Sequence, residues 1–202
     1  MSCTEVKISA RYWLQHTARI LAALIASIAS IPAVAQLCQR DVTPITFSSA
    51  NFIPNDNDDT VTMRNADGSP QLIWKRCAVG QTWDAPKKKC KGVPVKKTWK
   101  EALQLAALEP GGWRLPNINE LAAIIDYQCY APPINLTVFP NTPESDTAGF
   151  WSSTPFQHVV STSNTVEAVH AWYFRLSDGG LEHRPINEPT EKNFVKFVKS
   201  AN

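Results

Sequence analysis

The chain has 202 residues, of which 44% are hydrophobic and 19% are charged, with 20 Lys and Arg against 18 Asp and Glu. This composition supplies enough apolar side chains for a folded core, which excludes a wholly disordered chain. It also excludes a membrane protein with several spans, because only one extended apolar segment is present.

The first 35 residues have the pattern of a secretory signal peptide. Lys7, Arg11 and Arg19 supply a positive end, residues 20–34 form an uncharged apolar run, and Ala33-Val34-Ala35 fits the small-x-small cleavage pattern. The run is about 15 residues long, short of the roughly 20 needed to span a bilayer, so we expect cleavage after Ala35 rather than a retained anchor. We therefore expect an exported protein, periplasmic, at the cell surface or extracellular, with no membrane span after cleavage.

Removal of this leader leaves 167 residues, 17 basic and 17 acidic side chains, and four cysteines: Cys38, Cys77, Cys90 and Cys129. That length suits one domain. In an oxidising compartment the four cysteines form two disulfides, and three connectivities are open. The short loop between Cys77 and Cys90 favours a disulfide between these two, and a Cys38–Cys129 disulfide then follows by elimination. A zinc site is disfavoured, because the C-x12-C spacing has no second pair of ligands.

Residues 36–59 are polar and rich in turn formers, which predicts an arm or loop packed on a domain of residues 60–202. Within that domain, residues 60–63 and 71–74 are expected strands of a hairpin. Asn65-Ala66-Asp67-Gly68 lies between them, and an Asp-Gly pair is typical of a tight turn.

Two helices are predicted from capping signals. Thr98 with Glu101 three residues later forms a capping box, and Glu109-Pro110-Gly111-Gly112 ends that helix. Asn117 with Glu120 starts a second helix, which the apolar spacing extends to about Tyr127.

The last third of the chain changes to strand patterns. Four segments are short and rich in aromatic or β-branched residues: 150–154, 171–176, 181–186 and 194–198. A turn at residues 177–180 joins the middle two, and if Leu176 faces Leu181, then Arg175 lies opposite Glu182 as a favourable charge pair. Helices followed by strands predict an α+β fold.

A series of short motifs also occurs in a fixed order. They are Leu72-Ile73-Trp74-Lys75-Arg76-Cys77, Gly80-Gln81-Thr82-Trp83-Asp84, Trp99-Lys100-Glu101-Ala102, Gly112-Trp113-Arg114-Leu115-Pro116-Asn117 with Glu120-Leu121, Ile125-Asp126-Tyr127, Phe139-Pro140-Asn141-Thr142 and Phe150-Trp151-Ser152-Ser153-Thr154. Together they resemble the Lcl C-terminal domain family, an exported bacterial domain of largely unknown function named for a collagen-like adhesin. The resemblance spans about residues 60–199.

The resemblance implies a compact, disulfide-bonded fold similar to C-type lectins and formylglycine-generating enzymes, with two helices and a mainly antiparallel sheet. It also implies a surface-adhesion role, because the named member binds sulfated polysaccharides of host matrix. The chain departs from the family in two ways. Members often carry a cysteine where this chain has Phe197, which leaves the partner of Cys129 open, and the collagen-like stalk is absent, since there are 8 Gly and no Gly-X-Y run.

The strongest functional signal is a basic segment. Between residues 75 and 100 there are nine basic side chains and one acidic residue, Asp84. Such a concentration attracts polyanions, although a solvated surface is the plainer interpretation. Nucleic acid is disfavoured as the polyanion because export removes the opportunity. The candidate ligand-binding residues are Lys75, Arg76, Lys87, Lys88, Lys89, Lys91, Lys96 and Lys97, with Trp83 as a platform for a sugar face.

Other chemistry has less support. No catalytic motif occurs, and His158, His170 and His183 have no ligand spacing, so we expect no enzyme activity, catalytic residue or metal centre. Calcium remains an alternative, because Asp56-Asn57-Asp58-Asp59 offers hard oxygen ligands and Asn187-Glu188-Pro189 loosely resembles a sugar-binding triplet of calcium lectins. Both segments are more often plain turns, since Asn, Asp and Pro favour turns for conformational reasons alone. The first functional hypothesis is a lectin-like adhesion module for anionic glycans, and the second is a structural or protein-interaction subunit of a pilus tip or envelope assembly.

Overall fold

The structure is a computed structural model that describes residues 36–39, 51–55, 59–160 and 165–201, with side chains left out at residues 158–160 and 165–168. The expected signal peptide, residues 1–35, lies outside the described residues. In the described part of the chain, no helix is long and apolar enough to cross a membrane.

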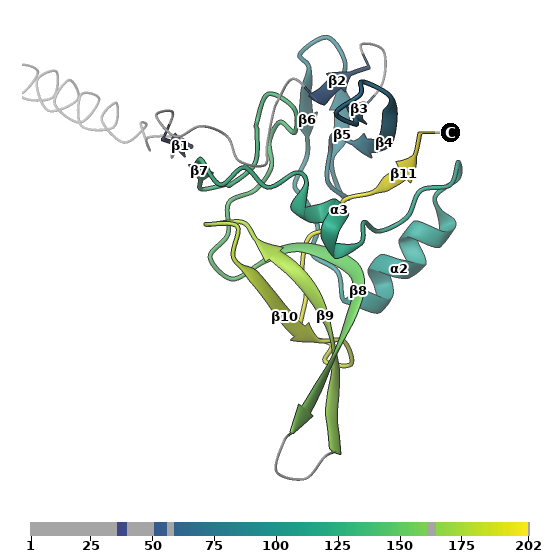
Figure 1. Cartoon of the computed structure of the whole chain (residues 1–202), viewed down its shortest axis with the longest axis vertical. Coiled ribbons are helices and arrows are strands. Elements are labelled where there is room, and N and C mark those ends of the chain that lie inside the picture. The colour runs from purple at the N-terminus through teal and green to yellow at the C-terminus, as the bar shows by residue number, and fades with distance from the viewer. Residues whose placement is uncertain (1–35, 40–50, 56–58, 161–164, 202) are drawn as a thin grey trace, which may run out of the picture. The chain divides into compact units, whose positions relative to one another are not determined.

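A four-stranded antiparallel sheet forms one side of the domain (Figure 1). Its central hairpin confirms the sequence prediction, with Thr62 opposite Ile73. Within the segment expected to be an arm, Phe52 is buried and its strand forms one edge of this sheet. In order across the sheet, the strands are β11 (Val198–Ser200), β4 (Pro70–Lys75), β3 (Thr60–Arg64) and β2 (Phe52–Pro54).

Two small two-stranded sheets accompany it. One pairs β1 (Leu37–Cys38) with β7 (Cys129–Tyr130), and the other pairs β5 (Thr82–Asp84) with β6 (Lys89–Lys91). The Cys38–Cys129 disulfide joins β1 directly to β7, so a covalent bond holds two strands that would be marginal alone. In the other sheet only Cys90 lies in a strand, and its disulfide ties β6 to Cys77, which follows β4.

The second large sheet has the order β10-β9-β8. Its strands are β8 (Gly149–Val160), β9 (Thr165–Arg175) and β10 (Leu181–Pro185). The segments expected at 150–154 and 171–176 are parts of these longer strands, which extend beyond the rest of the domain as a hairpin (Figure 1). Leu181 pairs with Phe174 rather than with Leu176, so the expected register was wrong. The expected ion pair is present nonetheless, with 2.9 Å between Arg175 Nη1 and Glu182 Oε1.

Both helices begin at the predicted caps. Helix α2 (Trp99–Leu108) starts after Thr98 and helix α3 (Ile118–Ala122) after Asn117, each with a complete capping box. Helix α3 is shorter than predicted, since it ends well before Tyr127. The N–H groups of Ile124 and Ile125 bond to carbonyls only three residues back, which tightens the chain into a turn.

Strands β8 and β9 are buried on both faces near their base, and this explains the apolar runs Phe150-Trp151 and Ala171-Trp172-Tyr173-Phe174. Neighbouring residues point to opposite faces of a strand, so Phe150 and Phe174 enter a core with α3 and the four-stranded sheet. Trp151 and Tyr173 enter a second core against α2. The prediction of a strand at 194–198 was wrong except for Val198, because residues 195–197 pass between these cores without regular pairing.

One lysine lies entirely within this packing. Lys196 is 1% exposed, and its Nζ donates to the carbonyl oxygens of Arg76 at 2.9 Å and Lys75 at 3.3 Å. The same nitrogen lies 4.6 Å from the ring centroid of Phe139 and 5.3 Å from that of Phe150. Burial lowers the pKa of Lys196 to about 7; Asp59 raises it and the Arg76 charge lowers it.

This burial predicts a pH-dependent stability. An unfolded lysine titrates near 10.4, so between about pH 7 and 10 the unfolded chain binds one more proton here than the folded chain. Stability therefore rises with pH, and we expect Lys196 to lower the unfolding equilibrium constant by up to about tenfold per pH unit in this range. Urea unfolding at pH 7, 8 and 9 would measure it. Lys196→Met lacks the titrating group, and an equal pH dependence in both proteins would contradict the prediction.

Candidate functional site

Two disulfides are present, joining Cys77 to Cys90 and Cys38 to Cys129. The question left open for Cys129 is thereby answered: its partner is on β1. The first disulfide connects the residue after Arg76 to the middle of β6, where Cys90 lies opposite Trp83. The turn that carries Lys87, Lys88 and Lys89, which we call the lysine turn, is thus tied through Cys90 to Cys77, just after β4.

A cavity of about 410 Å³ opens beside this disulfide, and we call it the Trp83 pocket. Its apolar walls come from three separate parts of the chain. Its charged residues are Arg76, directly after β4, and Lys88 and Lys89, where the turn between β5 and β6 leads into β6. The lining residues are Pro54, Arg76, Trp83, Lys88, Lys89, Leu136, Thr137 and Pro140.

Arg76 forms the rigid part of this pocket. Its side chain is 5% exposed and lies 4.3 Å from the ring centroid of Trp83. Its Nε donates to the Val138 carbonyl at 2.9 Å, and Nη2 donates to the Thr137 carbonyl at 3.0 Å. One face of the Trp83 indole is therefore used by a guanidinium, a stacking geometry that arginine favours.

A second connection, made by hydrogen bonds of Asn141, joins the β5–β6 hairpin to the wall formed by residues 136–140. Asn141 has a positive φ of 56°, a conformation that asparagine tolerates better than most residues. Its side-chain oxygen accepts the Cys90 N–H at 3.2 Å, and its carbonyl accepts Gln81 Nε2 at 3.1 Å. Both walls of the Trp83 pocket are thus held before any ligand arrives.

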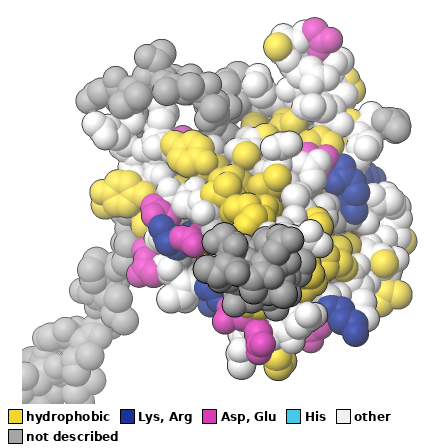
Figure 2. All heavy atoms as spheres, turned by 60° about the horizontal axis from the view of Figure 1, so that its bottom comes forward, with side chains coloured by type: hydrophobic (Ala, Val, Ile, Leu, Met, Phe, Trp, Pro, Cys, Tyr) yellow, Lys and Arg dark blue, Asp and Glu magenta, His cyan; other side chains and the backbone are white. Residues whose placement is uncertain are grey.

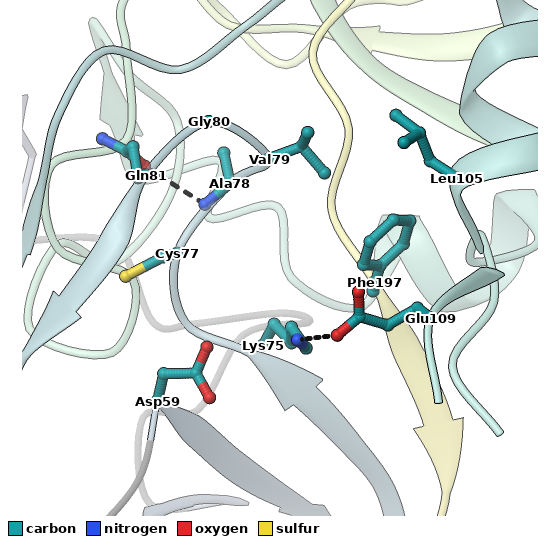
Figure 3. Close-up of a pocket in the computed structure, with 10 residues that line it drawn as sticks. All are labelled: Asp59, Lys75, Cys77, Ala78, Val79, Gly80, Gln81, Leu105, Glu109 and Phe197. Carbon is teal, nitrogen blue, oxygen red and sulfur yellow. Dashed lines mark hydrogen bonds and ion pairs between the residues drawn. The ribbon is translucent and has the colours of Figure 1, made fainter. Parts of the chain in front are cut away.

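The structure brings together Arg76, Trp83, Lys88 and Lys89 of the predicted site, and separates the rest. Lys75 points into a different pocket of about 210 Å³, where its Nζ lies 2.5 Å from Glu109 Oε1 (Figure 3). Lys75 therefore lines this second pocket and does not line the Trp83 pocket.

The remaining predicted lysines also have other positions. Lys91 lies 2.8 Å from Asp84, and this hydrogen bond lowers the pKa of that carboxyl. Lys96 is placed 5.1 Å from the Phe194 ring centroid, and the backbone of Lys97 pairs with Asn193. Lys87 is exposed in the turn next to Lys88. The nine basic residues therefore do not form one patch.

Among the described residues, the side chains considered for calcium binding and the histidines considered for catalysis do not come together in a site. Asp56, Asn57 and Asp58 lie outside that part of the chain, as does the His158 side chain. His170 and His183 lie 5.0 Å apart between ring centroids in an aromatic cluster with Phe156 and Trp172. In the described ranges no three His, Cys, Asp or Glu side chains are grouped as metal ligands would be.

Sequence reasoning missed four wall residues, Pro54, Leu136, Thr137 and Pro140, because they are far in the chain from the basic segment. The sequence does contain one signal for this wall. Phe139-Pro140-Asn141-Thr142 is among the family motifs, and its Asn141 is the residue that fastens the pocket wall to the β5–β6 hairpin.

The model of the Lcl C-terminal domain matches residues 64–199, which include most of the Trp83 pocket. The chain belongs to this family. No curated protein and no solved structure gives a match.

The two disulfides differ in the length of chain that they close, which predicts different losses when they are removed. Constraining the unfolded chain stabilises by about 3 kcal/mol for the 13-residue separation of Cys77 and Cys90, and by about 5 kcal/mol for the 91-residue separation of Cys38 and Cys129. Paired Cys→Ala variants compared by urea unfolding would measure both. A larger loss for the short loop would show that native contacts of the hairpin, rather than chain entropy, decide its stability.

Proposed function

We propose that this protein is an exported, lectin-like adhesion module that binds anionic, sulfated glycans at the Trp83 pocket. The observation that carries the proposal is the composition of that pocket. Three cationic side chains, Arg76, Lys88 and Lys89, share it with the apolar Pro54, Leu136 and Pro140. Sugar-binding sites use such a combination, since apolar ring faces pack on the walls while charged groups fix the orientation.

Arg76, Lys88 and Lys89 supply the positive charge of the pocket. Arg76 donates to the carbonyl oxygens of Thr137 and Val138, and these hydrogen bonds fix the orientation of its guanidinium. Lys91 lies outside the pocket lining and is paired with Asp84. We therefore assign the anionic group of the ligand to Arg76, Lys88 and Lys89, and treat Lys87 as a contributor to the wider field.

Two broader features support the proposal. The α+β fold with mainly antiparallel sheets and two disulfides suits the C-type-lectin-like assignment made from the resemblance. Disulfides form and persist in oxidising compartments, in agreement with export after cleavage of residues 1–35. Neither feature calls for catalysis, and we propose a binding protein rather than an enzyme.

A second candidate function rests on an apolar surface. Leu37 and Tyr130 pair across β1 and β7, and Tyr127 packs near Gly179 at the turn before Leu181. These four large side chains are 50–60% exposed, which favours a protein partner such as a pilus or envelope subunit. Hydrophobic side chains also gather on the face that carries the β8–β9 hairpin, where Lys and Arg are scattered (Figure 2).

The glycan proposal is tested by heparin chromatography and by titration of a heparin-derived oligosaccharide. We expect the oxidised protein to elute above about 0.15 M NaCl, where exposed charges are screened beyond ~8 Å. Lys88→Ala/Lys89→Ala should elute earlier, and by counterion release its slope of log affinity against log salt should fall by about two. The matched control is Lys100→Ala/Lys192→Ala, which removes the same charge from exposed positions outside the pocket.

Equal elution of the two double variants would contradict the proposed site, and elution of the unaltered protein below 0.15 M would contradict the proposed function. A glycan array with and without calcium separates the candidates further. Selective binding to sulfated glycans supports the adhesin, whereas a blank array with specific capture of an envelope protein, lost in Tyr127→Ser/Tyr130→Ser, supports the second candidate.

A further inference from the structure

The side chain of Gln36 bonds to a segment far along the chain. Its Nε2 donates to the carbonyl oxygen of Pro132 at 2.7 Å and to that of Ile134 at 2.6 Å. A side-chain amide has two N–H donors, and both are used here. Because both partners can only accept, they also establish which end of the amide is the nitrogen. We call this pair of hydrogen bonds the Gln36 contact.

The Gln36 contact lies at the start of a well-connected segment. Strand β1 follows at once and pairs with β7, and the Cys38–Cys129 disulfide joins the two strands. On the other side of the contact, Ile134 is fully buried, and the residues after it, 136–140, form a wall of the Trp83 pocket. Gln36 therefore connects the beginning of the domain to the segment that leads into the candidate site.

The same residue lies at the predicted cleavage point of the leader. The signal pattern puts the cut after Ala35, so that Gln36 becomes the first residue of the mature protein. The fold agrees with this position, since the compact unit of the structure runs from Gln36 to Asn202. A cut one residue later would leave Leu37 first and would remove the Gln36 contact. The position of cleavage thus has a consequence for the folded domain.

An N-terminal glutamine can react with its own side chain. The free α-amine attacks the side-chain amide carbon Cδ, so that a bond forms between the backbone nitrogen and Cδ. The bond between Cδ and Nε2 breaks, and Nε2 leaves as ammonia with a proton lost by the amine. The product is the lactam pyroglutamate, and no oxidant or reductant is consumed. The amine must be unprotonated, which is the case for about half of the chains near pH 8.

We propose that Gln36 is the N-terminal residue of the mature protein and a modification site at which pyroglutamate forms only while β1 is detached. In the folded chain, two carbonyl oxygens hold the Nε2 that has to leave as ammonia. Pyroglutamate has no Nε2, so a cyclised chain cannot form the Gln36 contact again, and the Ile134 carbonyl loses this donor. A chain that folds late is therefore altered permanently. The inference rests on the export that we propose above.

The test is intact-mass spectrometry of the full chain after export by a bacterial host. We expect the mass of residues 36–202 with two disulfides. The purified protein is then incubated near pH 8, where the amine is reactive, and the loss of one ammonia is followed with time. We expect this loss to be roughly thirtyfold slower in the folded protein than in the same protein in urea, the factor that corresponds to two hydrogen bonds of ordinary net strength.

The two disulfides provide a matched pair of variants. Cys38→Ala/Cys129→Ala releases β1 from β7 two residues from Gln36, and it should lose ammonia faster than the unaltered protein. Cys77→Ala/Cys90→Ala leaves that connection in place, and it should lose ammonia as slowly as the unaltered protein. Tryptophan fluorescence checks that each variant is folded. The comparison of folded and urea-unfolded unaltered protein needs neither variant.

Equal rates of ammonia loss in the folded and the urea-unfolded protein, or an N-terminal residue other than Gln36, would overturn the inference. Equal rates in the two folded variants would also overturn it, because β1 would then have no role. Retention of residues 1–35 would overturn the proposed export together with this inference. Glycan binding is decided separately by heparin chromatography, so its failure beside a protected Gln36 would overturn the adhesion proposal alone.

Discussion

Two basic side chains buried beside each other, Lys196 and Arg76, link the core of the domain to the candidate site. A buried cation is tolerated only when its donors are paired, and here carbonyl oxygens of the 75–76 and 137–138 segments accept them. Those carbonyls reach their places only when β4, the run before β11 and the 134–140 segment have packed together. The wall of the Trp83 pocket is therefore a product of core folding.

This arrangement explains how like charges are kept close. The lysine turn is short, is closed by the Cys77–Cys90 disulfide, and has Lys88 at a positive φ of 50°. Beside it, Asp84 forms an ion pair with Lys91. The cost of holding Lys88 and Lys89 near Arg76 is met during folding, so a ligand that relieves the repulsion does not have to order the loop as well.

Local chemistry could be predicted from the sequence, and long-range assembly could not. The capping boxes at Thr98 and Asn117 depend on residues three apart, and both occur as predicted. Nine basic residues within 26 positions suggested one patch, but the strands and loops that carry them face different neighbours. Lys196 was the hardest case, because alternation in an apolar segment normally puts a lysine in solvent, whereas this segment is buried on both sides.

The Cys38–Cys129 disulfide has a mechanical consequence. Its sequence separation is 91 residues. The loop that it closes contains the β3–β4 hairpin, helices α2 and α3, and most of the Trp83 pocket. A pull on the chain ahead of Cys38 passes through the sulfur atoms into β7 and then toward the C-terminal part. About 300 Å of chain cannot be drawn out by that pull, at roughly 3.3 Å per residue. Tension applied ahead of Cys38 would thus bypass Arg76, Trp83 and the lysines, and within the Trp83 pocket it would reach only the wall formed by residues 136–140.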